Sequence, residues 1–292
     1  MNDERLREEL ARGLSNAGLD ALATPALADA RWSIRIDTIP IAQSSPGGLS
    51  RIGGWPSLPP NTDWPRHQGE PLSFLGQFDL SELPANDILP STGLLSFFYD
   101  TRQESWGSNP ADRSSFRVWY FANTSDLVDV SKPRFDDAKT SIAGWLFGKR
   151  PHHGIQTFPL CKVAFRPFLS LPELSPDEDR DDADAEAFFE FKESLRGDHQ
   201  LLGWPTPIQG PMELECELIA NGLSLETAGV FRSQAATDLE PRAGNWRLLL
   251  ELSSDKNAGM MWGDAGSLYF WIRNEYLAAG DFDRCWCIFQ CH

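Results

Sequence analysis

The chain has 292 residues, of which 41% are hydrophobic and 23% are charged, so it can bury a core and lies outside the composition of disordered chains. Forty-two acidic residues against 26 basic ones give a formal net charge of -16, which argues against nucleic-acid and membrane partners because it repels phosphate groups and anionic lipids. The N-terminus is acidic, and no apolar stretch is long enough to cross a bilayer, so we expect a cytoplasmic protein.

An amphipathic helix is predicted within the N-terminal segment, residues 1–30. Leu6, Leu10 and Leu14 recur every four residues among Glu and Arg, which places them on one face of a helix. Gly18 interrupts this pattern, and Pro25 is expected to end the helix. The apolar face is expected to cover the body of the protein.

Strands are predicted through most of the remaining chain, where apolar residues alternate with polar ones or form short runs. These segments are 32–39, 72–80, 93–100, 116–121, 160–168, 212–219, 246–252, 266–273 and 284–291. Their connections are short, polar and rich in glycine and proline, which favours antiparallel pairing over helical crossovers. The predicted fold class is therefore α+β, with mainly antiparallel sheets and a few helices.

A strongly acidic segment, residues 177–186, separates two lobes of similar character. It holds seven acidic residues and one basic residue, and it leads into a segment with helical character. It is interpreted either as a solvated linker or as an acidic patch that binds a partner. The predicted organisation is an N-terminal helix (1–30), a first α+β lobe (31–172), an acidic linker and helix (173–197) and a second α+β lobe (198–292), with both lobes in one compact body.

Three of the five cysteines lie close to the C-terminus, at Cys285, Cys287 and Cys291. In a strand these side chains point to one face, where cysteine behaves as a small apolar residue. A metal site with His292 is the alternative, but zinc sites usually take ligand pairs from two separate elements. We therefore predict buried thiols, no metal site and no cofactor.

The two lobes share a sequence of features. Gly54-Trp55-Pro56 and Gly203-Trp204-Pro205 each precede an apolar strand and then a glycine-led aromatic strand. The same order of elements in both lobes predicts the internal duplication of one α+β unit.

Motifs in both lobes also carry a family resemblance. In the first lobe they are Gly53-Gly54-Trp55-Pro56-x-Leu58-Pro59, Trp64-Pro65, Phe74-Leu75-x-Gln77-Phe78-x-Leu80 and Gly93-Leu94-Leu95-x-Phe97-Phe98-Tyr99-Asp100. In the second lobe they are His199-x-Leu201-Leu202-Gly203-x-Pro205, Trp246-Arg247-Leu248-Leu249-Leu250, Met261-Trp262-Gly263-Asp264-Ala265-Gly266 and Tyr269-Phe270-Trp271-Ile272. Over about residues 30–291 the chain resembles the YwqG-like family of uncharacterised bacterial proteins, defined by a domain of unknown function. The resemblance implies a duplicated α+β fold and brings no reaction or catalytic residue.

The candidate ligand site is a polar cleft between the two lobes. Asp264 lies on a glycine-flanked segment, which suits either a ligand-binding carboxylate or a tight turn. Ligands often bind where polar side chains converge in a cleft. The other candidates for this cleft are Gln77, Asp79, His199 and Gln209.

Function is predicted from charge and from the motifs that are missing. The sequence holds no nucleophile elbow, phosphate-binding loop or dinucleotide fingerprint, so we expect a non-enzymatic role. The acidic charge favours a module that binds a basic protein partner, for example as an immunity or antitoxin-like protein, because opposite fields accelerate docking. The alternative is a small-molecule binding protein or enzyme with its cleft between the lobes, and the loop tryptophans suggest a carbohydrate-binding body as a third reading.

Overall fold

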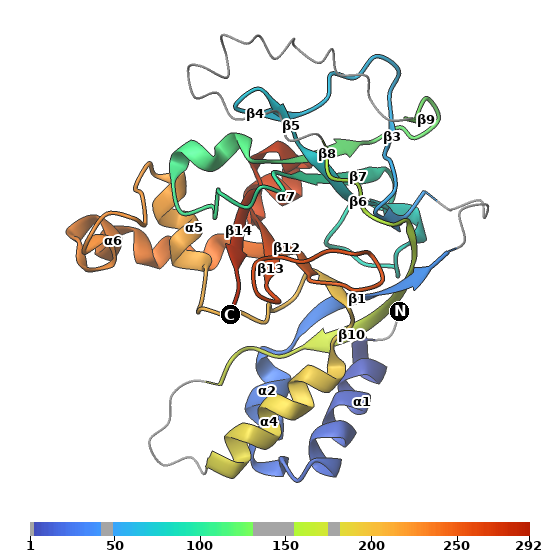
Figure 1. The fold of residues 1–292 in the computed structure, drawn as a ribbon. Coiled ribbons are helices and arrows are strands. Elements are labelled where there is room, and N and C mark those ends of the chain that lie inside the picture. The colour runs from blue at the N-terminus through green and yellow to red at the C-terminus, as the bar shows by residue number, and fades with distance from the viewer. Residues whose placement is uncertain (1–2, 42–48, 131–154, 175–181) are drawn as a thin grey trace.

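The fold is built on one large antiparallel sheet. The computed structural model describes residues 3–41, 49–130, 155–174 and 182–292 (Figure 1). The strands of this sheet are β1 (Arg31–Pro40), β2 (Arg51–Ile52), β6 (Ser73–Asp79), β7 (Leu94–Tyr99), β8 (Phe116–Phe121), β10 (Cys161–Ser170), β11 (His199–Leu201), β12 (Trp246–Ser253), β13 (Ser267–Arg273) and β14 (Trp286–Gln290). Their order across the sheet is β14-β13-β12-β11-β1-β10-β2-β6-β7-β8, and every neighbouring pair is antiparallel.

Several shorter elements accompany this sheet. Two short ribbons pair β3 (Ser57–Leu58) with β9 (Val128–Asp129), and β4 (Arg66–His67) with β5 (Glu70–Pro71). Short 3-10 helices are η1 (Leu80–Glu82), η2 (Pro110–Ser114), η3 (Val230–Arg232), η4 (Glu240–Asn245) and η5 (Phe282–Arg284). The predicted α+β class and the predicted antiparallel pairing are both confirmed.

The sheet curls until its two outer strands face each other, so it is nearly a barrel. Phe116 of β8 and Trp286 of β14 have ring centroids 5.2 Å apart. Inside the curl, the rings of Phe97 and Phe270 meet at 5.1 Å. The segment between β7 and β8 covers the outer edge of β14, since the backbone N–H of Phe289 donates to the carbonyl of Trp106 at 3.0 Å. An edge strand covered in this way is protected from pairing with another chain.

The sheet has the same construction on both sides of its central pair, β1 and β10. The second strand outward carries a bulge on each side, at Leu75 in β6 and at Leu249 in β12. The carbonyl of Leu75 accepts from the N–H of Gly53 at 2.8 Å, and that of Leu249 accepts from the N–H of Leu202 at 3.2 Å. Both donor residues have positive φ, 70° and 62°. The halves therefore share strand order, bulge position and the hydrogen bond at the bulge.

Three helices lie together at one end of the molecule, beside β1 and β10 (Figure 1). They are α1 (Asp3–Asn16), α2 (Asp20–Asp29) and α4 (Asp182–Leu195). Leu10 and Leu14 of α1 and Phe188 of α4 are buried in one shared cluster. The predicted N-terminal amphipathic helix is confirmed as α1. No helix among the described residues has the length and apolar character needed to span a membrane.

The prediction that Pro25 ends the N-terminal helix is wrong, because Pro25 lies inside α2. Gly18 has φ 76° and ends α1, so the chain turns and begins a second helix at Asp20. Proline in this helix removes one backbone hydrogen bond, which a short helix packed against two others tolerates.

The acidic segment falls only partly within the described residues. Residues 177–181 lie outside them, while 182–186 form the beginning of α4. Acidic residues in the first turn of a helix interact favourably with its dipole. The second half of this segment is therefore helical.

The prediction of a strand over 212–219 is wrong, because this segment forms the helix α5 (Glu213–Ala220). Met212, Cys216 and Ile219 are all buried, and their spacing of four and three places them on one face of a helix. Alternation put Glu217 on a solvent face, but it is buried and accepts hydrogen bonds from Trp246 Nε1 (2.9 Å) and Arg273 Nη2 (2.6 Å). The other α-helices of the described residues are α6 (Gln234–Leu239) and α7 (Asn274–Ala279).

Glu215 of α5 makes stability depend on pH. Burial, followed by the nearby charge of Glu213, raises the pKa of Glu215 from 4.5 to about 7. Between these two values the unfolded chain loses a proton that the folded chain keeps, so stability falls as pH rises and stays low above about 7. Glu215→Gln is expected to raise the free energy of unfolding by about 2 kcal/mol at pH 8 and by almost nothing at pH 4.

Urea unfolding of the wild type and the variant at both pH values measures this difference. The control is Glu8→Gln, which removes a carboxylate from an exposed position on α1. An equal gain from both substitutions at pH 8 would assign the effect to net charge and contradict the role of burial.

Candidate functional site

A polar cavity of about 630 Å³ lies beside the C-terminal end of α4 and the strands β11, β12 and β13. It is on the face of the sheet opposite the core, since Leu252 and Leu268 point inward and the adjacent Ser253 and Ser267 line the cavity. We call it the α4 cavity. Its lining residues are Arg35, Phe189, Glu193, Arg196, Gly197, Asp198, Thr206, Pro207, Ile208, Ser253, Ser254, Ala265, Ser267 and His292.

Arg35 reaches the α4 cavity from β1, which pairs with β11. Its Nε donates to Asp37 Oδ1 at 2.8 Å, which fixes the base of the guanidinium. Gly197 lies against the side chain, and a Cβ at this position would come within 2.4 Å of Arg35 Cγ. The position of Arg35 therefore depends on a glycine as its neighbour.

Arg196 connects the cavity to a buried acid in β12. Its Nη2 donates to Glu251 Oε1 at 2.5 Å, and its Nη1 donates to Glu193 at 3.0 Å. Glu251 is 1% exposed and also accepts from the backbone N–H of Thr206 at 3.0 Å. Burial raises the pKa of Glu251 although the charge of Arg196 opposes the shift. These contacts hold Arg196 and the backbone at Thr206 in place as the floor of the cavity.

A carboxylate and two hydroxyl groups line the same cavity. Asp198 Oδ2 accepts from the N–H of Thr38 at 2.8 Å and from its hydroxyl at 3.2 Å, which fixes the carboxylate. The hydroxyl of Ser267 donates to that of Ser253 at 3.0 Å. The cavity thus offers guanidinium groups, carboxylates and hydroxyls on backbone that strands hold in place.

His199 lies next to this cavity but does not line it. Its side chain is buried, with Nδ1 accepting from the N–H of Ser253 at 3.1 Å and Nε2 3.4 Å from Asp255 Oδ2. Burial acts to raise the pKa of Asp255, but the nearby His199 and Thr38 side chains and the hydrogen bond from the N–H of Asn257 outweigh it and lower the pKa. The neighbouring residue in sequence, Asp198, is the one that faces the cavity.

Asp264 and Gln209 lie at the rim of the cavity, where they hold the last residues of the chain. The carbonyl of Asp264 accepts from the N–H of His292 at 3.1 Å, and Gln209 Nε2 donates to the carbonyl of Cys291 at 2.7 Å. The carboxylate of Asp264 is exposed. The adjacent residues Ala265 and Ile208 line the cavity in their place.

Gln77 and Asp79 lie in β6, in the other half of the sheet. Gln77 is buried, accepts from the N–H of Ser57 at 2.8 Å and donates to the carbonyl of Leu49 at 2.7 Å. Asp79 accepts from the N–H of Ser81 at 2.9 Å and so caps η1. The structure brings His199, Asp264 and Gln209 close to one cavity and leaves Gln77 and Asp79 out of its lining.

The residues that do line the α4 cavity were missed by sequence reasoning. Arg35 occupies a polar position in a strand that alternates, and Ser253 ends the strand that begins at Trp246. Arg196 stands just after the last residue of α4. The polar face of the predicted strands could have indicated these residues. The sequence around each strand, however, does not show which helix end covers that face.

The cysteines near the C-terminus are buried, as predicted. Burial raises the pKa of the Cys285 and Cys287 thiols well above the usual range. Among residues 3–41, 49–130, 155–174 and 182–292, no three or more His, Cys, Asp or Glu side chains are grouped so that they could hold a metal ion.

One comparison with known proteins gives a match. A family model described as "Domain of unknown function (DUF1963)" matches residues 50–291. No curated protein matches the chain. The matched residues include the whole lining of the α4 cavity except Arg35 and His292. The match agrees with the predicted family of uncharacterised proteins, whereas the YwqG-like name stays a prediction.

Proposed function

The chain belongs to the family defined by the domain of unknown function DUF1963, and we propose that it binds a small zwitterionic molecule in the α4 cavity. A volume of about 630 Å³ lies in the range of small-molecule sites, which is roughly 300–1,000 Å³. The observation that carries the proposal is that positively and negatively charged side chains, each held in place by a hydrogen bond, line one cavity. Arg35 and Arg196 line it together with Glu193 and Asp198.

A ligand that carries charge of only one sign would lie close to side chains of the same sign in this cavity. A zwitterion such as a free amino acid places its carboxylate on the guanidinium and hydroxyl donors and its ammonium on Asp198 or Glu193. Because Asp37, Glu251 and Thr38 already hold these groups in place, binding would require little further ordering of side chains.

Calorimetric titration of the purified chain with each of the common free amino acids tests this function. We expect at least one to bind, and we expect Asp198→Asn and Arg35→Gln each to weaken its binding at least tenfold, because each removes one of the paired charges. The control is Arg232→Gln, an exposed arginine outside the cavity lining. Failure of every amino acid to bind at millimolar concentration, or equal affinity in all variants, would contradict the proposal.

A basic protein partner stays a prediction that rests on the net charge of -16. Opposite charges accelerate association and give specificity more than they give affinity. The fixed side chains of the α4 cavity favour a small ligand over this partner as the first function to test.

We further propose that the two halves of the sheet arose from one duplicated unit. The shared strand order and bulges support it, and so does one pair of side chains. Gln77 in β6 accepts from the N–H of Ser57, and Glu251 in β12 accepts from the N–H of Thr206. Ser57 and Thr206 each follow a Gly-Trp-Pro segment.

A further inference from the structure

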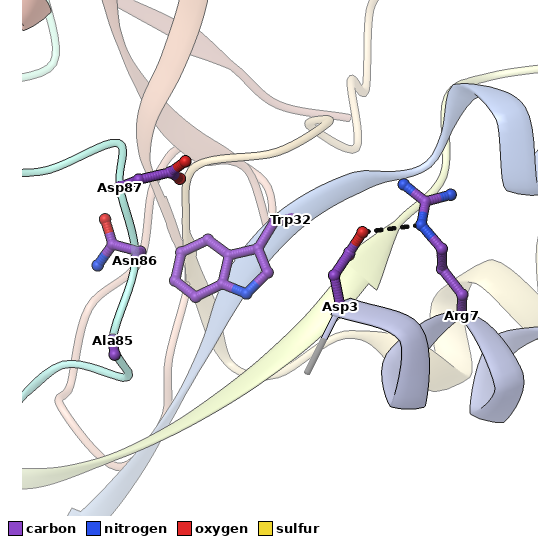
Figure 2. A pocket seen from close by; sticks show the side chains of 6 residues that line it. All are labelled: Asp3, Arg7, Trp32, Ala85, Asn86 and Asp87. Carbon is purple, nitrogen blue, oxygen red and sulfur yellow. Dashed lines mark hydrogen bonds and ion pairs between the residues drawn. The ribbon is translucent and has the colours of Figure 1, made fainter. Parts of the chain in front are cut away.

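A second cavity, of about 560 Å³, lies between the beginning of α1 and the loop that follows η1. It shares no lining residue with the α4 cavity, and we call it the Trp32 cavity. Its lining residues are Asp3, Arg7, Trp32, Ala85, Asn86 and Asp87. Figure 2 shows the Trp32 ring with Asn86 and Asp87 on one side and Asp3 and Arg7 on the other.

The ring of Trp32 is held in place by packing on two sides. It is half-buried and contacts both the core of the sheet and the cluster formed by the N-terminal helices. A packed, half-buried indole ring therefore forms part of the wall of the cavity. Among aromatic side chains, the face of an indole ring is the strongest partner for a cation.

The charged side chains around this ring differ in whether they have a partner among the described residues. Arg7 is neutralised by Asp3, with Nε 2.9 Å from Oδ2, and its Nη1 donates to the carbonyl of Leu27 at 2.8 Å. Asp87 has no hydrogen bond or ion pair with any described residue. Asn86 fixes the loop beside it, since its Oδ1 accepts from the N–H of Leu89 at 2.8 Å. One carboxylate is thus left beside the ring for a ligand.

We propose that the Trp32 cavity binds the guanidinium group of a small organic cation. A guanidinium is planar, so it stacks on an indole face and at the same time gives two parallel N–H bonds to one carboxylate. An alkylammonium offers a point charge and cannot do both. The chain already contains such a stack, because Arg31 Cζ lies 3.3 Å from the ring centroid of Trp204. The net charge of -16 also attracts cations.

The test is calorimetric titration of the full chain with agmatine, a small guanidinium compound. We expect agmatine to bind the wild type and to bind Asp87→Asn at least tenfold more weakly. The control is Asp63→Asn, which removes the same charge from another exposed loop residue, and it should bind as the wild type does. Both variants should keep the thermal midpoint of the wild type, because Asp87 and Asp63 are exposed.

Five results would overturn the proposal. Agmatine that fails to bind at millimolar concentration, or that binds Asp87→Asn and the wild type equally, would exclude this site. Equal weakening in Asp63→Asn would assign binding to the overall charge. If 1,4-diaminobutane binds as tightly as agmatine, the ring and carboxylate do not select a guanidinium. If an arginine-containing peptide binds and agmatine does not, the ligand is not a free small molecule.

Discussion

The substitution Gly203→Ala is expected to lower the free energy of unfolding by about 3 to 5 kcal/mol. Gly203 has φ 78°, a conformation that alanine adopts only under strain. A Cβ here would also lie 1.7 Å from Ser33 Oγ and 2.3 Å from Ser170 Oγ. These serines lie in β1 and β10, the central pair of the sheet, so the crowding cannot be relieved by moving a surface loop.

The two hydroxyls that crowd this position also form a hydrogen-bonded chain. Ser33 Oγ donates to Ser170 Oγ at 2.7 Å, and Ser170 Oγ accepts from the N–H of Trp204 at 2.7 Å. An added methyl group would have to break these buried bonds, which leaves polar groups unsatisfied. The missing side chain at position 203 is therefore what allows the chain after β11 to approach the centre of the sheet.

Urea unfolding of Gly203→Ala and Gly222→Ala separates crowding from backbone strain. Gly222 has φ 84°, and a Cβ at this position would meet no atom within 4 Å. Gly222→Ala is expected to cost about 1 kcal/mol, from the left-handed backbone alone. If Gly203→Ala is no more destabilising than this control, the central serines are not a barrier and the argument fails.

The strands were predictable where apolar residues form short runs, as in β6, β7 and β14, which are buried throughout, or alternate with polar ones. This holds for β1, whose buried positions include Ile34 and Ile36. It fails for β11, which is three residues long and buried on both faces, and for α5, where alternating Leu and Glu also suit a helix. Local pattern cannot separate these cases, because burial by distant elements decides them.

The α4 cavity was not predictable, because it depends on which strands pair. Along the chain, β1 comes before β2, β6, β7 and β8, but in the sheet it pairs with β11. In the same way, β10 comes before β11, β12, β13 and β14, but in the sheet it pairs with β2. This exchange places Arg35 opposite Gln200 in the register and brings it to Arg196 at the end of α4. A pairing of β1 with β2, its neighbour along the chain, would put Arg35 elsewhere. Three of the five residues predicted for a ligand cleft lie close to this cavity, but the sequence alone did not reveal this pairing of strands.

Glu251→Ala is expected to cost about 3 to 4 kcal/mol, because it leaves the Arg196 guanidinium without its buried partner and the N–H of Thr206 without an acceptor. Glu251→Gln should cost only about 1 kcal/mol, since a neutral amide oxygen can still accept from that N–H. Gln77 makes this bond to the N–H of Ser57 in the other half of the sheet.

The control uses the second carboxylate bound to the same arginine. Glu193 is 36% exposed against 1% for Glu251, so Glu193→Ala should cost less than about 1 kcal/mol. Urea unfolding at pH 7 measures all three variants. Because Glu251 fixes Arg196, Glu251→Ala should also weaken any ligand of the α4 cavity, whereas Glu251→Gln should keep most of the binding. Equal costs for Glu251→Ala and Glu193→Ala would mean that the buried pair neither stabilises the fold nor shapes the cavity.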